Sequence, residues 1–456
     1  MDKIQAVYFL GIGGIGMSNL ARYFMSKGKK VAGYDRTETA LTKELAKEGA
    51  EVHYFDSVKL IPVYCLDKKY TLVVYTPAIP RDNEELLFFL NEKFTMKKRA
   101  EVLGIITKSN KGLCCAGTHG KTTTSSMLAH ILKQSHLDCN AFLGGILKNY
   151  NSNLLLSDKS TLTVIEADEY DRSFHWLHPY MALITSVSPD HLDIYGTAEE
   201  YTKSFEKFTS LVQPGGALVM RQGINLKPQV QAGVKVYTYG IEEGDFRAQN
   251  IKIGNGEIIF DFVTPEEEIK DVHLGVPIKI NIENGVGAMA IAYLNGATAD
   301  ELRSAMKSFM GAKRRFDFYL KTDKIVFIDD YAHHPDELRA SITSVKELYP
   351  DRKVTGVFQP HLYTRTRDFV DQFAESLSLL DELILLDIYP AREEPIKGVS
   401  SQIIFDKVTC PKMLCSKEEL LKVLEEKKDI DVLLTMGAGD IDKLLLPIKE
   451  LLEKRI

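Results

Sequence analysis

The sequence has few of the features that mark secreted proteins. Its 456 residues include one tryptophan and six cysteines, and no two cysteines form a C-x-x-C pair. A large chain with so few thiols, spread without a framework, is typical of the reducing cytoplasm rather than of a disulfide scaffold. We therefore expect reduced, buried thiols and a cytoplasmic protein.

Membrane segments and a basic excess are also missing. No apolar run reaches the ~20 residues that span a bilayer, and glycines interrupt the N-terminal stretch where a secretory signal needs an apolar core. Lys and Arg number 57 against 63 Asp and Glu, a net charge of −6. Nucleic-acid binding usually requires a basic excess. We expect neither membrane nor nucleic acid among its partners, and a monomer and a homodimer both stay open.

Strand-like and helical segments alternate along the chain, which predicts an α/β protein. An apolar run at 4–10, a glycine-rich turn, a helical stretch and a second strand at 31–35 open a Rossmann-like unit. A second strand, turn and helix occupy 112–132, and Thr298 with Glu301 forms a capping box for a later helix. At roughly 150 residues per domain, we predict a Rossmann-like domain at 1–105, a P-loop ATPase-like domain at 106–311 and a Rossmann-like α/β domain at 312–456.

The first glycine turn matches a dinucleotide-binding pattern. Gly11, Gly13 and Gly16 have the G-x-G-x-x-G spacing, and Asp35 follows where a ribose-binding acid is expected. Taken alone, the turn would favour a nicotinamide-dependent oxidoreductase. Because a second phosphate loop follows, a nucleotide-linked substrate is equally compatible with it.

That second loop, Gly117 to Thr122, reads GTHGKT. It ends as a phosphate loop does, although Cys115 stands where the usual G-x-x-x-x-G-K-[ST] pattern has its first glycine. Such a loop offers backbone N–H groups and a helix N-terminus to phosphates, a lysine charge, and a hydroxyl to Mg²⁺. The strand–loop–helix context favours an ATP site with Lys121 at the phosphates over a chance Gly-Lys-Thr.

Polar residues follow two further strand-like runs. Four carboxylates lie between Glu166 and Asp171, and a cation would relieve their repulsion. Mg²⁺ prefers few carboxylates together with phosphate oxygens and water, so Glu166, next to the strand, is the first choice of ligand. His191 is a candidate for metal or phosphate. The alternatives are a solvated acidic turn and a structural, hydrogen-bonded histidine.

The predicted third domain carries arginines and histidines at strand ends. They lie in KRRF (313–316), DDYAHHP (329–335) and HLYTRTR (361–367). Arginine forks suit carboxylates and phosphates. The alternative for each taken singly is a surface arginine or a helix cap.

Together these motifs resemble the Mur ligase family, the ATP-dependent amide-bond ligases of peptidoglycan synthesis. The resemblance covers nearly the whole chain, through LGIGGIGM, TPAIP, EADEYD, SPDHLD, NIENG, KRRF, DDYAHHP, LLDIYPAREEP and MGAGD. The loop GTHGKTTT, with histidine at its variable position, resembles that of the family branch that acts on the muramate carboxylate. A departure is Leu362, where the family often has arginine.

The resemblance implies a reaction. It is the ATP-dependent joining of L-alanine to the lactyl carboxylate of UDP-N-acetylmuramate through an acyl phosphate, with Mg²⁺. An alternative is a ligase that joins a recycled murein tripeptide to the same muramate. A nicotinamide-dependent oxidoreductase would leave Lys121, Glu166 and His191 unexplained. A complete phosphate loop together with a metal set argues against a non-catalytic nucleotide-binding protein.

The resemblance also implies site residues. The residues implied to bind the UDP-sugar are Gly11, Gly13, Gly14, Gly16, Asp35, Thr76, Pro77 and Ala78. The residues implied to bind ATP are Gly117, Thr118, His119, Gly120, Lys121, Thr122, Thr123, Asn284, Arg315 and Asp330. The metal ligands are Thr122, Glu166 and His191, and the catalytic residues are Lys121, Glu166, His191, His333 and Arg365. The group that deprotonates the amine, and a carbamylated lysine near 203–207, stay open.

Overall fold

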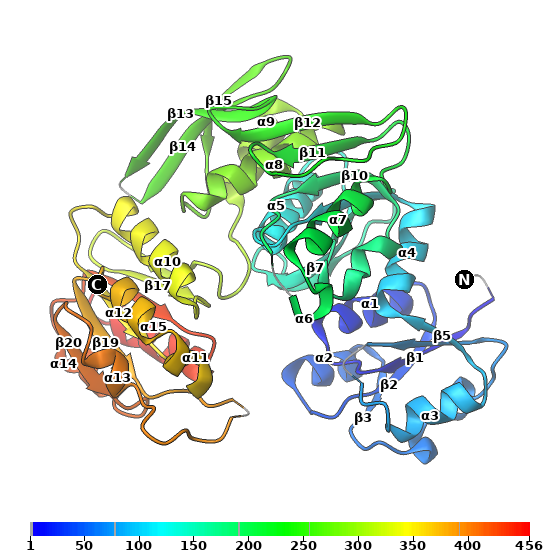
Figure 1. The fold of residues 1–456 in the computed structure, drawn as a ribbon, viewed down its shortest axis with the longest axis horizontal. Helices are drawn as coiled ribbons and strands as arrows, with labels where there is room; N and C mark the ends of the chain where they lie inside the picture. Colours follow the sequence, from blue (N-terminus) through cyan, green and yellow to red (C-terminus); the bar gives the residue numbers. More distant parts are fainter. Residues whose placement is uncertain (1–2, 77–78, 190–191, 255, 392) are drawn as a thin grey trace. The chain divides into compact units, whose positions relative to one another are not determined.

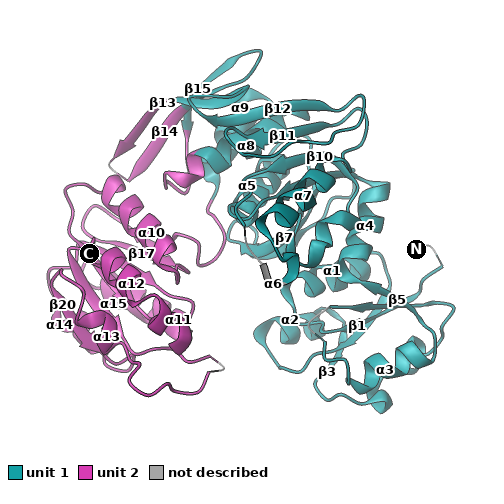
Figure 2. Cartoon of the chain, in the orientation of Figure 1, with its two compact units in different colours: residues 1–249, 261–272, 283–309 teal, residues 250–260, 273–282, 310–456 magenta. Residues whose placement is uncertain are grey.

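The structure is a computed structural model that describes residues 3–76, 79–189, 192–254, 256–391 and 393–456 (Figure 1). It divides into two compact units (Figure 2). The first comprises residues 1–249, 261–272 and 283–309, and the second comprises 250–260, 273–282 and 310–456.

The first unit opens with a five-stranded sheet in the order β3-β2-β1-β4-β5, and every pairing in it is parallel. Its strands are β1 (Ala6–Leu10), β2 (Lys30–Tyr34), β3 (Glu51–His53), β4 (Thr71–Tyr75) and β5 (Thr95–Lys98). The helices are α1 (Ile15–Ser26), α2 (Ala40–Glu48), α3 (Glu84–Asn91) and α4 (Arg99–Ser109), with short 3₁₀ turns η1 (Val58–Leu60) and η2 (Val63–Cys65).

Helix α1 starts directly after the glycine turn at the carboxyl end of β1. Its buried side chains include Met17, Leu20, Ala21 and Phe24, the spacing of one helix face. Gly11 has φ +87°, and a Cβ there would lie 2.9 Å from Thr76 Cγ2. The turn therefore needs glycine both for its backbone and for space.

The second sheet has ten strands in the order β15-β14-β13-β12-β11-β10-β6-β9-β7-β8. They are β6 (Lys111–Ala116), β7 (Asn140–Leu147), β8 (Ser152–Leu155), β9 (Leu162–Glu166), β10 (Pro179–Ile184), β11 (Ala217–Arg221), β12 (Lys235–Ile241), β13 (Phe246–Gly254), β14 (Glu257–Val263) and β15 (Glu268–His273). Strand β6 pairs in parallel with β9 and β10, so the ends of all three strands meet at one edge. The helices are α5 (Lys121–Gln134), α6 (Leu192–Tyr195), α7 (Ala198–Thr209), α8 (Ile280–Leu294) and α9 (Ala299–Ser308), with η3 (Tyr170–Trp176).

The second unit contains a six-stranded sheet in the order β16-β17-β21-β18-β19-β20. Its strands are β16 (Asp317–Lys321), β17 (Val326–Asp330), β18 (Val354–Phe358), β19 (Glu382–Leu386), β20 (Lys412–Cys415) and β21 (Val432–Met436), and the edge strand β16 runs antiparallel to β17. The helices are α10 (Pro335–Leu348), α11 (Tyr363–Asp368), α12 (Val370–Leu377), α13 (Gln402–Phe405), α14 (Leu420–Glu426) and α15 (Leu445–Glu453), with η4 (Asp440–Leu444).

The α/β class with Rossmann-like parallel sheets is confirmed, and the division at 105 and 311 stays a prediction. The six cysteines are free thiols, five of them buried, as expected. Among the described helices, none combines the length and apolar character needed to cross a bilayer.

Candidate active site

The phosphate-type loop joins β6 to α5, and two of its glycines are required by its shape. Gly117 has φ +144°, and a Cβ there would lie 2.1 Å from Thr185 Oγ1. Gly120 has φ +82°, and a Cβ there would lie 2.7 Å from Asn284 Oδ1. Side chains at these positions would meet both backbone strain and a clash, so the loop holds a conformation open only to glycine.

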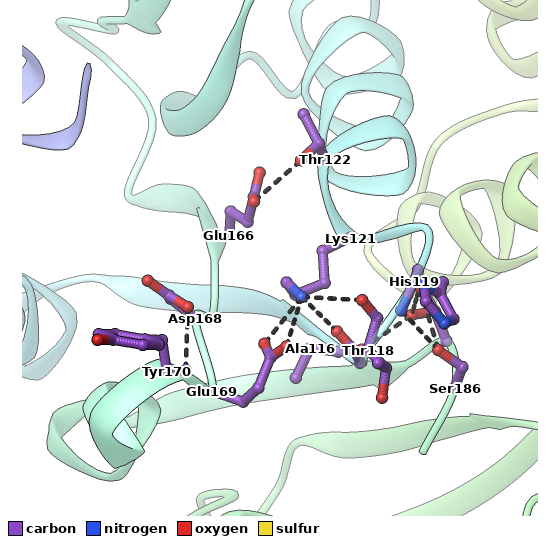
Figure 3. Close-up of polar contacts among 12 residues, drawn as sticks. Ala116, Thr118, His119, Lys121, Thr122, Glu166, Asp168, Glu169, Tyr170 and Ser186 are labelled. Carbon is purple, nitrogen blue, oxygen red and sulfur yellow. Dashed lines mark hydrogen bonds and ion pairs between the residues drawn. The ribbon is translucent and has the colours of Figure 1, made fainter. Parts of the chain in front are cut away.

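The segment after β10 fixes the middle of the loop. The Thr118 N–H donates to the Ser186 carbonyl at 3.1 Å, and the His119 N–H donates to Ser186 Oγ at 2.8 Å (Figure 3). The Thr118 hydroxyl donates to the Ser188 carbonyl at 2.8 Å. The predicted ATP residues Thr118 and His119 are thus held by the segment that follows β10.

Lys121 lies at the first position of α5 and folds back over the loop. Its Nζ donates to the Gly117 carbonyl at 2.6 Å and to Glu169 Oε1 at 2.9 Å (Figure 3). The exposed fractions of the Lys121 and Glu169 side chains are 14% and 3%. Burial raises the pKa of Glu169. The loop lysine is therefore positioned at the strand edge and paired with an internal carboxylate.

Thr122 and Glu166 lie side by side in the same place. Thr122 Oγ1 donates to Glu166 Oε1 at 3.0 Å (Figure 3). The Gly144 N–H donates to Glu166 Oε2 at 3.0 Å. Burial raises the pKa of Glu166. A Cβ at Gly144 would lie 2.4 Å from Oε2, so glycine is what lets this backbone approach the carboxylate.

One hydroxyl and one carboxylate fit a Mg²⁺ ion that takes its other ligands from phosphate oxygens and water. Within the described part of the chain, no three His, Cys, Asp or Glu side chains gather to hold a metal by themselves. The third predicted ligand, His191, lies outside the described residues.

The remaining predicted ATP residues of the first unit lie close by. Thr123 is in the first turn of α5. The Thr124 hydroxyl donates to Asn284 Oδ1 at 3.2 Å, which brings Asn284 on α8 against the start of α5. The phosphate-type loop, the predicted metal ligands Thr122 and Glu166, and Asn284 therefore lie close together in the structure.

A pocket of ≈ 220 Å³ adjoins Glu166 within the first unit. One wall comes from the starts of α1 and α4, and the other from β7 and the end of β9. The lining residues are Ile15, Gly16, Asn19, Arg99, Leu103, Phe142, Leu143, Gly144, Glu166 and Asp168. The pocket thus connects the first glycine turn with the predicted metal ligand.

The first glycine turn is tied to β2 through Asp35. The Gly13 N–H donates to Asp35 Oδ2 at 2.8 Å, and the Thr37 N–H donates to Oδ1 at 3.0 Å. A Cβ at Gly13 would lie 2.8 Å from Asp35 Oδ2. Asp35 shapes the turn in this structure, and its expected contact with a ribose stays a prediction. Gly14 lies at the N-cap of α1, and Pro77 and Ala78 lie outside the described residues.

Four predicted site residues, Arg315, Asp330, His333 and Arg365, belong to the second unit. Arg315 lies over the Tyr331 ring, 5.7 Å from its centroid, and Asp330 ends β17. His333 Nδ1 is 3.0 Å from the Tyr331 carbonyl oxygen, and burial lowers the His333 pKa. The second histidine of this motif, His334, caps α10 through the Asp336 N–H.

His361 joins His333 to Arg365, although the residue pattern did not single it out as a site residue. Its ring centroid is 6.1 Å from that of His333, and its Nδ1 is 3.5 Å from Arg365 Nη1. The Tyr389 ring stacks on His361 at 5.8 Å. Leu362, next to His361, has φ +71°, an uncommon conformation for this residue type.

Glu169 and Arg99 are the other site residues that the residue pattern did not single out. Glu169 was visible as one of four clustered carboxylates, but nothing in the cluster indicated which one would face Lys121. Arg99 lies in no glycine turn or acidic cluster, and its place in the pocket depends on segments far apart in sequence.

Family models match most of the chain. They are Mur ligase family, catalytic domain (residues 6–111), Mur ligase middle domain (115–292) and Mur ligase, glutamate ligase domain (314–439). A UDP-N-acetylmuramate–L-alanine ligase of Parabacteroides distasonis is 66% identical over 458 residues, with 100% of this chain and 99% of that protein covered.

Solved structures are similar as well. A UDP-N-acetylmuramate–alanine ligase from Thermotoga maritima matches with a TM-score of 0.81 and 27% identity, over 99% of this chain and 100% of its own. A murein peptide ligase from Psychrobacter arcticus matches with a TM-score of 0.63 and 21% identity, over 98% of each chain. The second likeness is one of fold alone.

Proposed function

The chain belongs to the Mur ligase family, and we propose that it joins L-alanine to the lactyl carboxylate of UDP-N-acetylmuramate. The reaction is ATP-dependent and belongs to the synthesis of peptidoglycan precursors. The observation that carries the proposal is the meeting of Lys121, Thr122 and Glu166 at one sheet edge, beside a pocket that reaches the first glycine turn. This arrangement suits the activation of a nucleotide-linked carboxylate by ATP.

ATP and Mg²⁺ have matching residues in this chain. The loop from Gly117 to Thr123 would hold the phosphates of ATP, with Asn284, Arg315 and Asp330 as further nucleotide contacts. Thr122 and Glu166, together with His191, would hold Mg²⁺. When bound, the ion supplies positive charge that lowers the repulsion between the phosphates and an incoming carboxylate.

The chemistry requires activation because a carboxylate is a poor acyl donor. Transfer of the terminal phosphoryl group of ATP to the lactyl carboxylate gives an acyl phosphate and ADP. The amine of L-alanine then attacks the acyl carbon, phosphate leaves, and an amide is formed. The ammonium form of alanine must lose a proton before it can attack.

This chain's residues would serve those steps in separate ways. Lys121 would exchange Glu169 for phosphate oxygens and neutralise their charge. Loop N–H groups beside the start of α5 would orient the transferring group. His333 and Arg365 would place the amino acid, with the arginine fork suited to its carboxylate. The walls of the pocket would exclude water from the acyl phosphate.

The alternative acceptor, a recycled murein tripeptide, is not favoured. A whole-chain relative at 66% identity is an L-alanine ligase, whereas the likeness to a murein peptide ligase is limited to the fold. We therefore propose small-molecule partners, UDP-N-acetylmuramate and L-alanine, and a cytoplasmic location. A monomer and a homodimer are both compatible with this proposal.

The test is phosphate release from ATP with purified protein, UDP-N-acetylmuramate and Mg²⁺, with L-alanine, the tripeptide or neither as acceptor. We expect release that depends on UDP-N-acetylmuramate and L-alanine together. Release with the tripeptide and not with L-alanine would support the alternative acceptor. Release that ignores both acceptors would contradict the ligase proposal.

A further inference from the structure

The pocket beside Glu166 contains a single basic side chain. Of the described residues that line it, two are acidic, Glu166 and Asp168, and Arg99 is the one base. Resting on the proposed function, we propose that Arg99 binds the lactyl carboxylate of the sugar nucleotide and so distinguishes a muramate from a plain N-acetylhexosamine.

The structure places Arg99 between the two ends of the pocket. It is the first residue of α4, and a Cβ at Gly16 would lie 2.6 Å from its Nη1. The guanidinium therefore packs on the first turn of α1, where glycine leaves room for it. On its other side, Arg99 Nη2 donates to Asp168 Oδ2 at 3.2 Å. Asp168 follows Glu166 by two residues in the sequence.

The pairing with Asp168 leaves Arg99 able to take a second carboxylate. The guanidinium has five N–H donors, and within the described residues the structure gives it this one hydrogen bond. The Arg99 and Asp168 side chains are 26% and 40% exposed, so their pairing is weak and exchangeable. Asp168 Oδ1 accepts the Tyr170 N–H at 3.0 Å, which keeps the carboxylate turned toward the arginine.

The chemistry of the pocket favours an anionic sugar as its occupant. A substrate carboxylate that approaches Glu166 and Asp168 would be repelled unless a cation lies between them. The diphosphate is served by the glycine turn and the N-terminus of α1, as in related dinucleotide folds. ATP activates the lactyl carboxylate. This part of the sugar nucleotide should therefore lie nearest to Glu166, where the ATP phosphates and Mg²⁺ are proposed to bind.

Two further features of the walls suit the N-acetyl sugar. Asn19 is 2% exposed, and its amide nitrogen donates to the Leu143 and Asn153 carbonyls at 3.1 Å and 3.0 Å. Its Oδ1 has no hydrogen-bond partner among the described residues, so the side chain adds an unpaired polar atom to this wall of the pocket. The side chains of Leu103, Phe142 and Leu143 provide apolar contact for an acetyl methyl group.

The test measures binding without ATP, by calorimetric titration and displacement, with UDP-N-acetylmuramate, UDP-N-acetylglucosamine and UDP. The last two ligands keep the diphosphate and lack the lactyl carboxylate. For Arg99→Ala we expect UDP-N-acetylmuramate to bind ten- to about a hundredfold more weakly, the usual loss of a charge-assisted hydrogen bond. We expect binding of the other two ligands to change less than about twofold, within the scatter of neutral surface substitutions.

Two variants control for charge and for folding. Lys97→Ala removes one positive charge two residues away, from a side chain that pairs with Glu101 and does not line the pocket, and should leave all three affinities unchanged. Arg99→Lys keeps the charge and loses the fork, so it should give an intermediate loss for UDP-N-acetylmuramate. Thermal unfolding of each variant checks that the fold is retained.

Two results would overturn the inference. Equal weakening of all three ligands in Arg99→Ala would assign the arginine to the diphosphate, and unchanged binding of UDP-N-acetylmuramate would remove it from the site. Failure of the wild-type protein to release phosphate with both substrates would instead count against the proposed function. The two failures are therefore distinguishable.

Discussion

Lys121, at the end of the phosphate-type loop, and Glu169, which follows β9, form a largely buried ion pair, with Nζ 2.9 Å from Oε1 and 2.8 Å from Oε2. The same ammonium group donates to the Gly117 carbonyl at 2.6 Å. The pair keeps the lysine inside the loop and neutralises its charge. We expect incoming phosphates to replace the carboxylate, since they offer more negative charge to the same donor.

The first prediction separates the structural role of this lysine from its chemical role. Lys121→Ala should lower the free energy of unfolding by about 3 kcal/mol, because it leaves the Glu169 carboxylate buried without a cation. It should also reduce phosphate release by at least about 10²-fold. In the double variant Lys121→Ala/Glu169→Gln, stability should recover while activity stays low. Equal stability of the single and double variants in urea unfolding would contradict this account of the pair.

The second prediction concerns the shape of the loop. Gly120→Ala meets both φ +82° and Asn284 Oδ1 at 2.7 Å, so it should weaken ATP binding at least about tenfold, the equivalent of roughly 1.4 kcal/mol. Gly28→Ala is the matched control, because φ there is +71° but nothing lies within 4 Å of the added Cβ. It should cost about 1 kcal/mol of stability and leave ATP binding unchanged. Equal ATP affinities for the two variants would count against steric fit in the loop.

The third prediction concerns Mg²⁺. Glu166→Gln removes the charge of the proposed ligand and should raise the Mg²⁺ concentration for half-maximal phosphate release at least about tenfold. Asp171→Asn, in the same acidic segment but paired with Lys98 at 3.3 Å, should leave that concentration unchanged. Chelation of Mg²⁺ should stop release in all variants. If both variants raised this Mg²⁺ concentration equally, the effect would come from the negative charge of the whole segment, which would contradict a specific role for Glu166.

The fourth prediction concerns stability in acid. Burial lowers the pKa of His130 to about 4, and its ring nitrogens contact Tyr150 Oη and Ser308 Oγ at 3.0 Å each. Because the unfolded histidine has a pKa near 6.5, the unfolded chain binds the proton more readily. This contribution is complete above about pH 6.5 and decreases as the pH falls toward 4.

Between pH 6.5 and pH 5 the His130 contribution should fall by about 2 kcal/mol. Urea unfolding of the wild type and of His130→Gln at both pH values measures it. The difference in stability between the two proteins should shrink as the pH falls, because glutamine does not titrate. A difference that is constant with pH would show that His130 is readily protonated in the folded protein.

Sequence reasoning predicted those elements whose signals are local. The glycine turn, helix α1 and the capping box of α9 at Thr298 and Glu301 are all present, because each depends on residues a few positions apart. The family resemblance and the α/β fold class are likewise confirmed. Strands β12 to β15 were not predicted, although IKIGNGEIIF (251–260) contains an Asn-Gly pair between two partly apolar runs, which is a local signal for a β-hairpin.

The sequence predicted which residue types form the site, but it did not predict which of their side chains contact one another. Lys121 and Glu166 carry their chemistry in the sequence, but the choice of Glu169 as partner of Lys121 depends on how the chain turns after β9. Arg99 reaches the pocket only because α4 begins beside α1 and Asp168. Such approaches between distant segments are set by tertiary packing, which one sequence alone does not display.

The most direct measurement of the central claim is phosphate release from ATP by the wild type and by Lys121→Ala, with UDP-N-acetylmuramate and Mg²⁺, with and without L-alanine. The account predicts release by the wild type only when both substrates are present, formation of the UDP-N-acetylmuramoyl-alanine amide in equal amount, and neither in the variant. Release without amide formation, or amide formation that survives in Lys121→Ala, would contradict it.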